Sequence, residues 1–524
     1  MNERIEKWLG AGRRFPVLIG LLAVAGFGLR MIQMGNPLFG DELSTLWIVG
    51  NNGFFDSVSL VSSNAEITPP LYFMLSWLTT QLGSAPELVR IPALVAGTLT
   101  IPMSALLGYR TVSRTTGLLA GLIVAISPYM TYFSANGRAY SLMVFFLLGS
   151  VLAMLAAIRT GRTRWWVLFA VCAALSMYSH YMGGFVLAAA LLWLLVLHPP
   201  QRKPALLATF CAAIAYLPWI PSMLADNDSP TKEVMEHLQG DGFDQKRTQV
   251  EQWLVGQPLI EPGAVPGKLA MFLFAAGLAV GLAGVVLKLV RDRDLMVGGK
   301  SVLPGLSLVA LMTLSVPVAQ LLLLLLGTDL FGARNLAPAW AGLPVLIGAL
   351  ISLPAFSLAA VATALTVGAF LIGAVRMTDP DLASTGYGGA ARFIEANAGP
   401  GDVVMDSSHF TPVPLTELDT ELSQDWPEYR VNLPIGDPPF LPVLAQVVPP
   451  DEQIAEAFGK AAREDGKVFA VTWNPPLTDA SKDGLYAPEG ATRGIPKGWH
   501  LTETRTWDGY RPVTVNVFEQ SPSQ

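Results

Sequence analysis

The sequence predicts a polytopic α-helical membrane protein followed by a C-terminal α/β domain. Of its 524 residues, 52% are hydrophobic and only 14% are charged, and the mean hydropathy is +0.45. This composition is far more apolar than that of a soluble globular protein. Apolar runs of roughly 20 residues, long enough to cross ~30 Å of hydrocarbon, recur through the first three-quarters of the chain. The net charge of −6 is spread along the chain and gives no indication of a nucleic-acid partner.

Eleven segments are predicted to span the membrane. The first is expected to be an uncleaved signal-anchor, because no small-x-small cleavage site follows it. Two free cysteines lie within the spans and are expected to pack there, with no disulfide framework. The spans are Phe15–Gln33, Arg90–Tyr109, Thr115–Phe133, Tyr140–Ile158, Arg164–Ser179, Met182–His198, Pro204–Met223, Leu269–Val290, Val302–Leu326, Leu336–Leu353 and Ala355–Val375.

Basic residues predict the orientation of these spans. Arg13 and Arg14 directly precede the first span, which places the N-terminus in the cytoplasm. The later basic loops all fall on the same side, at Arg110, Arg114, Arg159, Arg162, Arg164, Arg202, Lys203, Lys288, Arg291, Arg293 and Lys300. An odd number of spans then places the C-terminus outside the cytoplasm.

This alternation requires that Pro70–Leu82 does not cross the membrane. At about 13 residues the segment is short for a span. We predict a helix that lies in the outer interface, with Tyr72, Phe73 and Trp77 as its aromatic anchors.

The chain is predicted to divide into a transmembrane domain at 1–376 and a soluble extracytoplasmic α/β domain at 377–524. The second part is polar, rich in proline and free of further spans. Its pattern predicts helices at Ala390–Ala398 and Asp451–Glu464 and strands at Asp402–Met405, Lys467–Thr472, Thr502–Thr506 and Thr514–Glu519.

A pair of carboxylates follows the first span. Asp41 and Glu42 begin a stretch that contains Glu66 and has no Lys or Arg before Arg90. A carboxylate held at the membrane surface is suited to act as a general base. The alternative interpretation is that the pair caps the first turn of a helix.

Ionisable residues also gather at the predicted outer ends of several spans. Arg30, Arg138, His180 and Arg334 occupy such positions, where ionisable groups are costly and are often functional. Singly, the arginines are as consistent with snorkelling or contact with bulk headgroups, and the histidine with a satisfied interfacial position. Their common side of the membrane favours a shared phosphate ligand.

Several short motifs resemble the GT-C glycosyltransferases in order and sidedness. They are Gly40-Asp41-Glu42, Thr68-Pro69-Pro70-Leu71-Tyr72, Arg90-Ile91-Pro92, Gly137-Arg138-Ala139-Tyr140, Tyr178-Ser179-His180-Tyr181 and Arg334-Asn335. The similarity is to the protein O-mannosyltransferase-like group, family 39, which includes lipid A aminoarabinose transferases, and it covers roughly Phe15–Leu353.

The resemblance implies transfer of a sugar from a polyprenyl-phosphate donor to an acceptor hydroxyl on the extracytoplasmic face. Asp41 matches the catalytic acid and Glu42 is its neighbour. The implied substrate-binding residues are Glu66, Tyr72, Arg138, Tyr140, His180, Tyr181, Arg334 and Asn335, with the two arginines on the donor phosphate.

Two departures from the family pattern leave the donor and any dependence on a divalent metal open. Asn136 stands where relatives often have Glu, and Asn335 stands where they often have Tyr. The acceptor is a glycan, lipid or protein. A transporter of lipid-linked sugars and a non-catalytic membrane subunit are the alternative functions.

Overall fold

The structure is a computed structural model, and it describes residues 2–226, 242–406, 415–423, 428–430, 450–473 and 495–521. It divides into two units. The helical unit comprises Met1–Met34 and Ile48–Thr378, and the C-terminal unit comprises Gly35–Trp47 and Asp379–Gln524. The short segment Gly35–Trp47, in the first loop, therefore belongs with the C-terminal unit.

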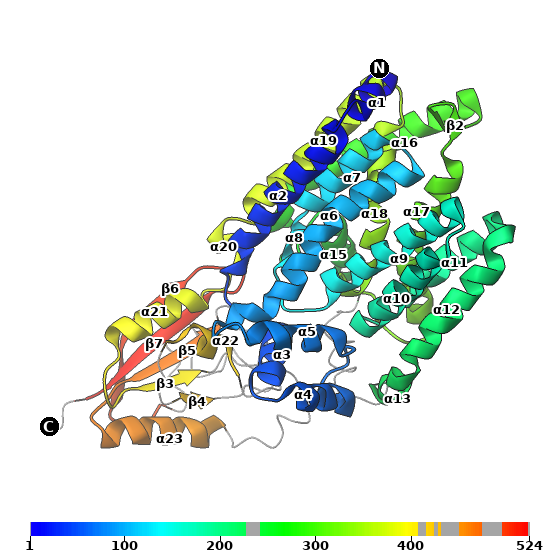
Figure 1. The fold of residues 1–524 in the computed structure, drawn as a ribbon. Coiled ribbons are helices and arrows are strands. Elements are labelled where there is room, and N and C mark those ends of the chain that lie inside the picture. Colours follow the sequence, from blue (N-terminus) through cyan, green and yellow to red (C-terminus); the bar gives the residue numbers. More distant parts are fainter. Residues whose placement is uncertain are drawn as a thin grey trace. The chain divides into compact units, whose positions relative to one another are not determined.

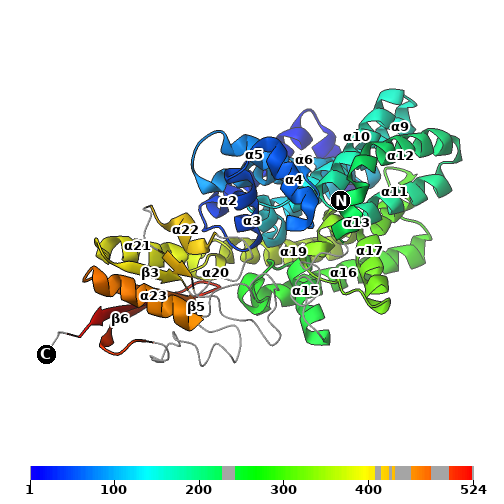
Figure 2. The same cartoon turned by 90° about the horizontal axis from the view of Figure 1, so that it is seen from below.

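Each of the eleven predicted spans coincides with a helix, a helix with its short continuation, or a bent pair of helices. The single helices are α2 (Arg14–Met34), α6 (Ile91–Thr111), α9 (Tyr140–Thr160), α10 (Thr163–Ser179), α11 (Gly183–Leu197), α16 (Lys268–Asp292), α17 (Leu303–Leu325) and α19 (Phe356–Arg376). The seventh segment is α12 (Arg202–Tyr216), which continues through η4 (Leu217–Trp219) into α13 (Ile220–Ala225). In the helical unit, α9, α10 and α12 pack in succession (Figure 2).

The third and tenth spans are the bent pairs. Helix α7 (Arg114–Ile126) meets α8 (Pro128–Ser134) at 61°, and η7 (Arg334–Ala341) meets α18 (Leu343–Ser352) at 57°. The first bend has a local cause, because Pro128 lacks an amide hydrogen and keeps Ser127 extended. The Ser127 hydroxyl then caps α8 by accepting from the amide of Met130.

The apolar helices make this a multi-pass membrane protein. In the described part of the chain, seven helices are long and apolar enough to cross a membrane, and nine spans result if each bent pair counts as one. Helices α10 and α11, with 17 and 15 residues, are shorter. The eleven predicted segments are thus all helical, but length and composition support seven to nine of them as full spans.

The first loop contains α4 (Phe54–Leu60), η1 (Val61–Ala65), α5 (Leu71–Thr80) and η2 (Pro86–Arg90). Helix α5 has 10 residues, as expected for a helix that does not cross a membrane. Its predicted aromatic anchors were wrong in part: Tyr72 and Phe73 are each only 1% exposed. The Tyr72 hydroxyl donates to the carbonyl of Val89 at 2.8 Å, so this face of α5 packs on protein.

Different elements lie at the two ends of the helical unit. Helices α5 and α13 lie at one end, and α1 (Asn2–Gly10) lies at the other (Figure 1). The hairpin of β1 (Met296–Val297) and β2 (Lys300–Ser301) is at the same end as α1.

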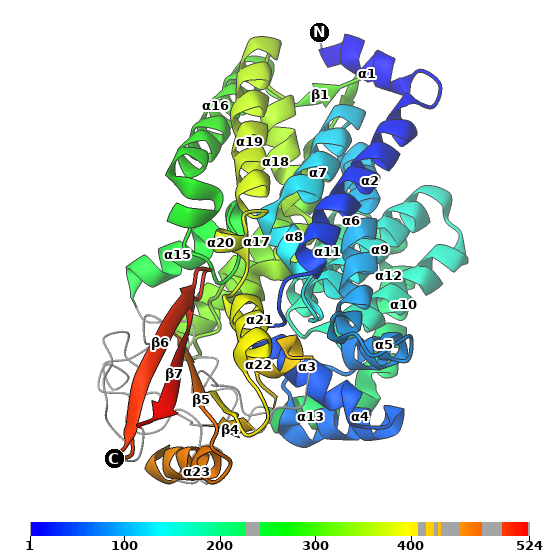
Figure 3. The ribbon, with the colours of Figure 1, turned by 90° about the vertical axis from the view of Figure 1, so that its left-hand side faces the viewer.

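The C-terminal unit is an α/β sandwich. Its sheet has the order β4-β3-β5-β7-β6, in which β3 pairs in parallel with β4 and β5, and β7 pairs antiparallel with β5 and β6. The long β6–β7 hairpin is seen in Figure 3. The strands are β3 (Val403–Asp406), β4 (Glu428–Arg430), β5 (Val468–Trp473), β6 (Trp499–Trp507) and β7 (Val513–Gln520).

Alternating residues of the sheet build two cores. Val404 packs with α21 (Tyr387–Asn397) on one face, whereas Val403 and Met405 pack with α23 (Pro450–Arg463) on the other. The four strands and two helices predicted for this region are therefore present. The pattern did not reveal β4 or the short helices α20 (Pro380–Ala383) and α22 (Glu417–Glu421).

Candidate active site

The predicted site residues are shared between the two units. Asp41 and Glu42 belong to the C-terminal unit. The other eight belong to the helical unit, namely Glu66, Tyr72, Arg138, Tyr140, His180, Tyr181, Arg334 and Asn335.

Arg138 and Glu66 form a buried bidentate ion pair. The Arg138 Nη1 atom lies 2.7 Å from Glu66 Oε2, and Nη2 lies 3.0 Å from Oε1. Nη2 also donates to the hydroxyl of Thr68 at 2.9 Å. Arg138 and Glu66 are 6% and 7% exposed. Arg138 was predicted to bind the donor phosphate with its guanidinium group. In the structure, that group is paired with the carboxylate of Glu66.

Two prolines explain why this carboxylate faces the arginine. Pro69 disfavours a helical conformation at Thr68, and Glu66 itself is extended, with φ of −150° and ψ of 142°. Helix α5 begins only after Pro70. The Pro-Pro turn therefore presents the side chains of Glu66 and Thr68 together.

His180 links the two arginines. It ends α10, and its ring lies 5.3 Å from the ring of Tyr140. Burial, together with the positive charges of Arg138 and Arg334, lowers the pKa of His180 to about 3. Both guanidinium groups thus lie within electrostatic reach of His180, although their elements are distant in the sequence.

The protonation of His180 differs from the prediction of pooled cations. Its low pKa makes the imidazole neutral near pH 7, and Nδ1 accepts a hydrogen bond from the amide of Met182 at 3.3 Å. The remaining proton is therefore assigned to Nε2, which serves as a neutral hydrogen-bond donor.

This histidine predicts a pH dependence of stability. Because its folded pKa of about 3 lies below the ordinary value of 6.5, the unfolded chain binds a proton more readily between these values. We expect the stability of the protein to decrease as the pH drops from about 6.5 toward 3. In a His180→Gln variant, the decrease over the same pH range should be smaller. Melting temperatures in detergent across this range measure it, and identical pH slopes for the two proteins would contradict it.

The loop before η7 holds Arg334 in place. The amide of Ala333 donates to Gln249 Oε1 at 2.7 Å, and the carbonyl of Ala333 accepts from the hydroxyl of Tyr129. The side-chain amide of Asn335, which was predicted to bind substrate, donates to the carbonyl of Leu330 at 2.9 Å. These contacts fix the backbone on both sides of Arg334.

A second connection runs from this loop to α15 (Phe243–Leu254). Lys246 pairs with Asp329 at 2.5 Å and also donates to the carbonyl of Phe331 at 3.2 Å. The sequence analysis missed both residues. Two sequence features could have identified them. Asp329 is an acid just before Phe331-Gly332-Ala333-Arg334, and Lys246 is a basic residue in a polar helix between two spans.

Asp226 is a further residue that the sequence analysis missed. The hydroxyl of Tyr181 donates to Asp226, and the indole of Trp219 donates to the Tyr181 oxygen at 3.1 Å. Burial, together with the nearby charge of Glu66, raises the pKa of Asp226, while the bond from Tyr181 opposes this shift. Asp226 and Glu66 are thus close, consistent with the packing of α13 against η1. The sequence feature that could have identified Asp226 is its position as the first acid after the seventh span.

Arg30 has a structural role. Its guanidinium is fully buried and donates to three backbone carbonyls, those of Gly26, Val124 and Ala125, at 2.9, 3.0 and 3.3 Å. Including it among the cations that gather for a phosphate was therefore wrong. It instead joins α2 to the end of α7.

Asp41 and Glu42 differ in exposure. They open α3 (Asp41–Gly50), directly after Gly40, whose φ of +59° suits glycine. Asp41 is exposed, whereas Glu42 is only 2% exposed and accepts from the amide of Phe39 at 3.4 Å. Glu42 is therefore held within the turn before α3, and Asp41 is the exposed carboxylate of the pair.

The C-terminal unit holds this turn. Phe39 lies in the core between α21 and the sheet, contacts the ring of Tyr510 edge-on, and is covered by the guanidinium of Arg511 at 4.5 Å. The amide of Gly40 donates to Glu417 Oε1 at 3.3 Å. Burial raises the pKa of Glu417 to about 7. The accessible acid thus extends from a turn anchored on both sides of Gly40.

Within the described ranges, no group of three or more His, Cys, Asp or Glu side chains is arranged to hold a metal ion.

Comparisons with known proteins identify the fold. Residues 68–221 match the sequence profile of the family described as dolichyl-phosphate-mannose-protein mannosyltransferase. No match to a curated protein was found. The crystal structure of ArnT from Cupriavidus metallidurans bound to undecaprenyl phosphate is 14% identical, with a TM-score of 0.55, and the alignment covers 97% of this chain and 98% of ArnT.

Two further structures are similar. ArnT from Cupriavidus metallidurans in the apo state is 14% identical, with a TM-score of 0.52 and coverage of 95% of this chain and 97% of ArnT. The archaeal oligosaccharyltransferase AglB from Archaeoglobus fulgidus, in complex with an inhibitory peptide and a dolichol-phosphate, is 12% identical, with a TM-score of 0.49 and coverage of 89% and 70%. The chain therefore resembles a mannosyltransferase family over residues 68–221 and shares the fold of ArnT.

Proposed function

We propose that this protein transfers a sugar from a polyprenyl-phosphate donor to an acceptor hydroxyl on the extracytoplasmic face. The observation that carries the proposal is that Arg138 and Arg334 both lie within electrostatic reach of the buried ring of His180. The match of residues 68–221 to a mannosyltransferase family and the undecaprenyl phosphate bound to ArnT, whose fold is similar, support a lipid-phosphate donor. In this proposal the N-terminus is cytoplasmic and the C-terminal unit is extracytoplasmic, as the basic loops predict.

Arg334 is assigned to the donor phosphate. A guanidinium stabilises negative charge that develops on the departing phosphate, and its planar fork matches phosphate oxygens. Neutral His180 adds a hydrogen bond from Nε2 without carrying charge. Arg138 is a positioning residue in this scheme, because its ion pair with Glu66 sets the local charge and geometry beside His180.

Asp41 is assigned as the general base. Its carboxylate takes the proton from the acceptor hydroxyl as the acceptor oxygen forms a bond to the anomeric carbon. The bond from that carbon to the phosphate oxygen breaks, and polyprenyl phosphate leaves with the electron pair. Attack opposite the leaving group inverts the anomeric configuration.

The C-terminal unit acquires a role in this scheme. Phe39 and the hydrogen bond from Gly40 to Glu417 anchor the turn that carries Asp41. Positioning a catalytic group by packed neighbours contributes to rate, because the group need not be ordered during the reaction. The acceptor remains a glycan, lipid or protein hydroxyl in this proposal.

Arg334 provides the test of donor binding. We expect Arg334→Ala to weaken binding of a polyprenyl-phosphate sugar by about tenfold or more, the equivalent of one charge-assisted contact. Arg334→Lys is expected to restore only part of it, because an ammonium cannot supply the bidentate fork. Affinity is measured in nanodiscs, with Arg247→Ala as a control because Arg247 is exposed and pairs with Asp244 and Glu251. Unchanged affinity in Arg334→Ala would contradict the donor assignment and favour a non-catalytic subunit.

A further inference from the structure

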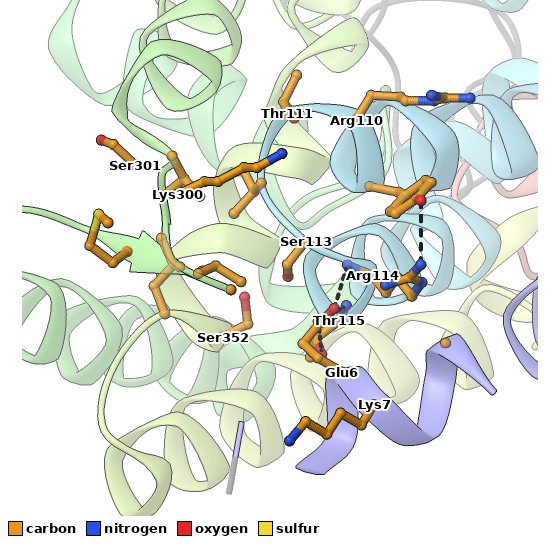
Figure 4. A pocket seen from close by; sticks show the side chains of 18 of the residues that line it. Glu6, Lys7, Arg110, Thr111, Ser113, Arg114, Thr115, Lys300, Ser301 and Ser352 are labelled. Atoms are coloured by element: carbon orange, nitrogen blue, oxygen red, sulfur yellow. Dashed lines mark hydrogen bonds between the residues drawn. The ribbon is translucent and has the colours of Figure 1, made fainter. Parts of the chain in front are cut away.

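The helical unit carries a large basic pocket at the end where α1 lies. Its volume is about 1250 Å³. The pocket is formed by α1, the turn between α6 and α7, the β1–β2 hairpin and the end of α18 (Figure 4). Helix α6 has 21 residues and separates this turn from Arg90 by about 30 Å. The pocket is therefore distinct from the candidate active site.

The charge of the lining is strongly positive. One acid, Glu6, lines the pocket together with six cations, namely Lys7, Arg110, Arg114, Arg159, Lys288 and Lys300. Among the described residues, none of these cations lies within ion-pair distance of a carboxylate. Several cations around one concave, partly apolar surface favour an anion.

The carboxylate of Glu6 is hydrogen-bonded to the start of α7, and this engagement limits how far it can offset the positive charge of the lining. Its carboxylate accepts from the amides of Thr115 and Arg114 at 2.7 and 3.2 Å, and from the Thr115 hydroxyl. This contact docks α1 beside the pocket and offsets the unpaired amides at the start of that helix.

Hydroxyl groups complete the lining. Thr111, Ser113, Ser301 and Ser352 all border the pocket, and Lys300 extends from β2 toward Thr111 (Figure 4). Phosphate oxygens only accept hydrogen bonds, so a combination of ammonium, guanidinium and hydroxyl groups suits them.

The surroundings of the pocket indicate a lipid as the source of the phosphate. Trp8 on α1 is 51% exposed, and Leu287 and Val290, on either side of the lining residue Lys288 on α16, are 62% and 77% exposed. Leu287 and Val290 lie on α16, a helix long and apolar enough to span a membrane, and Trp8 directly follows the lining residue Lys7. A ligand with a phosphate group and acyl chains matches both surfaces.

We propose that this pocket binds the phosphate headgroup of an anionic phospholipid in the leaflet at the α1 end of the helical unit. The inference is independent of the proposed sugar transfer. By the predicted orientation this leaflet is the cytoplasmic one.

The test is a lipid titration of the full chain in neutral detergent, followed by native mass spectrometry. The probes are short-chain phosphatidylglycerol, short-chain phosphatidylcholine and inorganic phosphate. The Lys7→Gln/Lys300→Gln double variant removes two exposed pocket cations. The matched control, Arg162→Gln/Lys203→Gln, removes two exposed cations that lie outside the pocket lining on the predicted same side.

We expect phosphatidylglycerol to bind the wild-type protein and the control alike, and the pocket variant to bind it about tenfold or more weakly. Phosphatidylcholine should bind poorly to all three. Competition by inorganic phosphate as strong as that by phosphatidylglycerol would overturn the lipid assignment in favour of a soluble phosphate. Equal weakening in the pocket variant and the control, or no binding of either phosphate probe, would overturn the pocket itself.

Discussion

Replacing Asp41 by Asn is expected to lower turnover by about 100-fold or more, within the ~10²–10⁴ range of a general base. The amide keeps the size of the side chain but cannot take the acceptor proton. Because Asp41 is exposed and Glu42 is buried in the turn, the substitution should leave folding and donor affinity nearly unchanged. Turnover and donor affinity of the purified variant are measured side by side.

Glu42→Gln is the control for this experiment. Its side chain accepts from the amide of Phe39, so the variant tests the turn itself while Asp41 stays in place. We expect a smaller loss of turnover than in Asp41→Asn, accompanied by lower stability. Near-wild-type turnover in Asp41→Asn would remove this residue from the role of base.

Arg138→Ala is expected to destabilise the protein by about 3–5 kcal/mol, because it leaves the buried Glu66 carboxylate without its bidentate partner. Arg247→Ala is the matched control, since it removes an exposed arginine from surface pairs and should cost about 0–1 kcal/mol. Unfolding of the variants in mixed micelles gives the free energies.

The double variant Glu66→Ala/Arg138→Ala separates the pair from its parts. With both charges removed, its destabilisation should be clearly less than the sum of the two single variants. An Arg138→Ala variant as stable as Arg247→Ala would contradict the description of this ion pair as structural.

The helices and the C-terminal strands could be predicted from the sequence because they follow from local patterns. Apolar runs and the alternation of β-strands depend on neighbouring residues alone. The shift of Gly35–Trp47 into the C-terminal unit could not be predicted in this way. It depends on Phe39 entering a core formed by residues some 350 positions later, such as Tyr387 and Ile394.

The sequence named the residues of the candidate site, but it did not predict which of them pair with one another. Sequence position placed Glu66, Arg138, His180 and Arg334 on one side of the membrane, and the structure brings these four together. It could not show that Arg138 is bound to Glu66 or that His180 is neutral, because both depend on burial and on charges from distant elements.

Arg30 illustrates the same limit. An arginine near the end of a span has the same sequence signal whether it faces a ligand or the carbonyls of a neighbouring helix. Only the packing of α2 against the end of α7 distinguishes the two.

The activity proposed for this protein is the transfer of a sugar from a lipid-phosphate donor. The most direct test incubates the purified protein in nanodiscs with radiolabelled polyprenyl-phosphate sugars and membrane-derived acceptors. We predict a labelled product that forms with the wild-type protein and is nearly absent with Asp41→Asn. If no donor yields a labelled product, although the protein is folded and Arg334-dependent donor binding is observed, sugar transfer by this chain is contradicted and a binding or transport role is favoured.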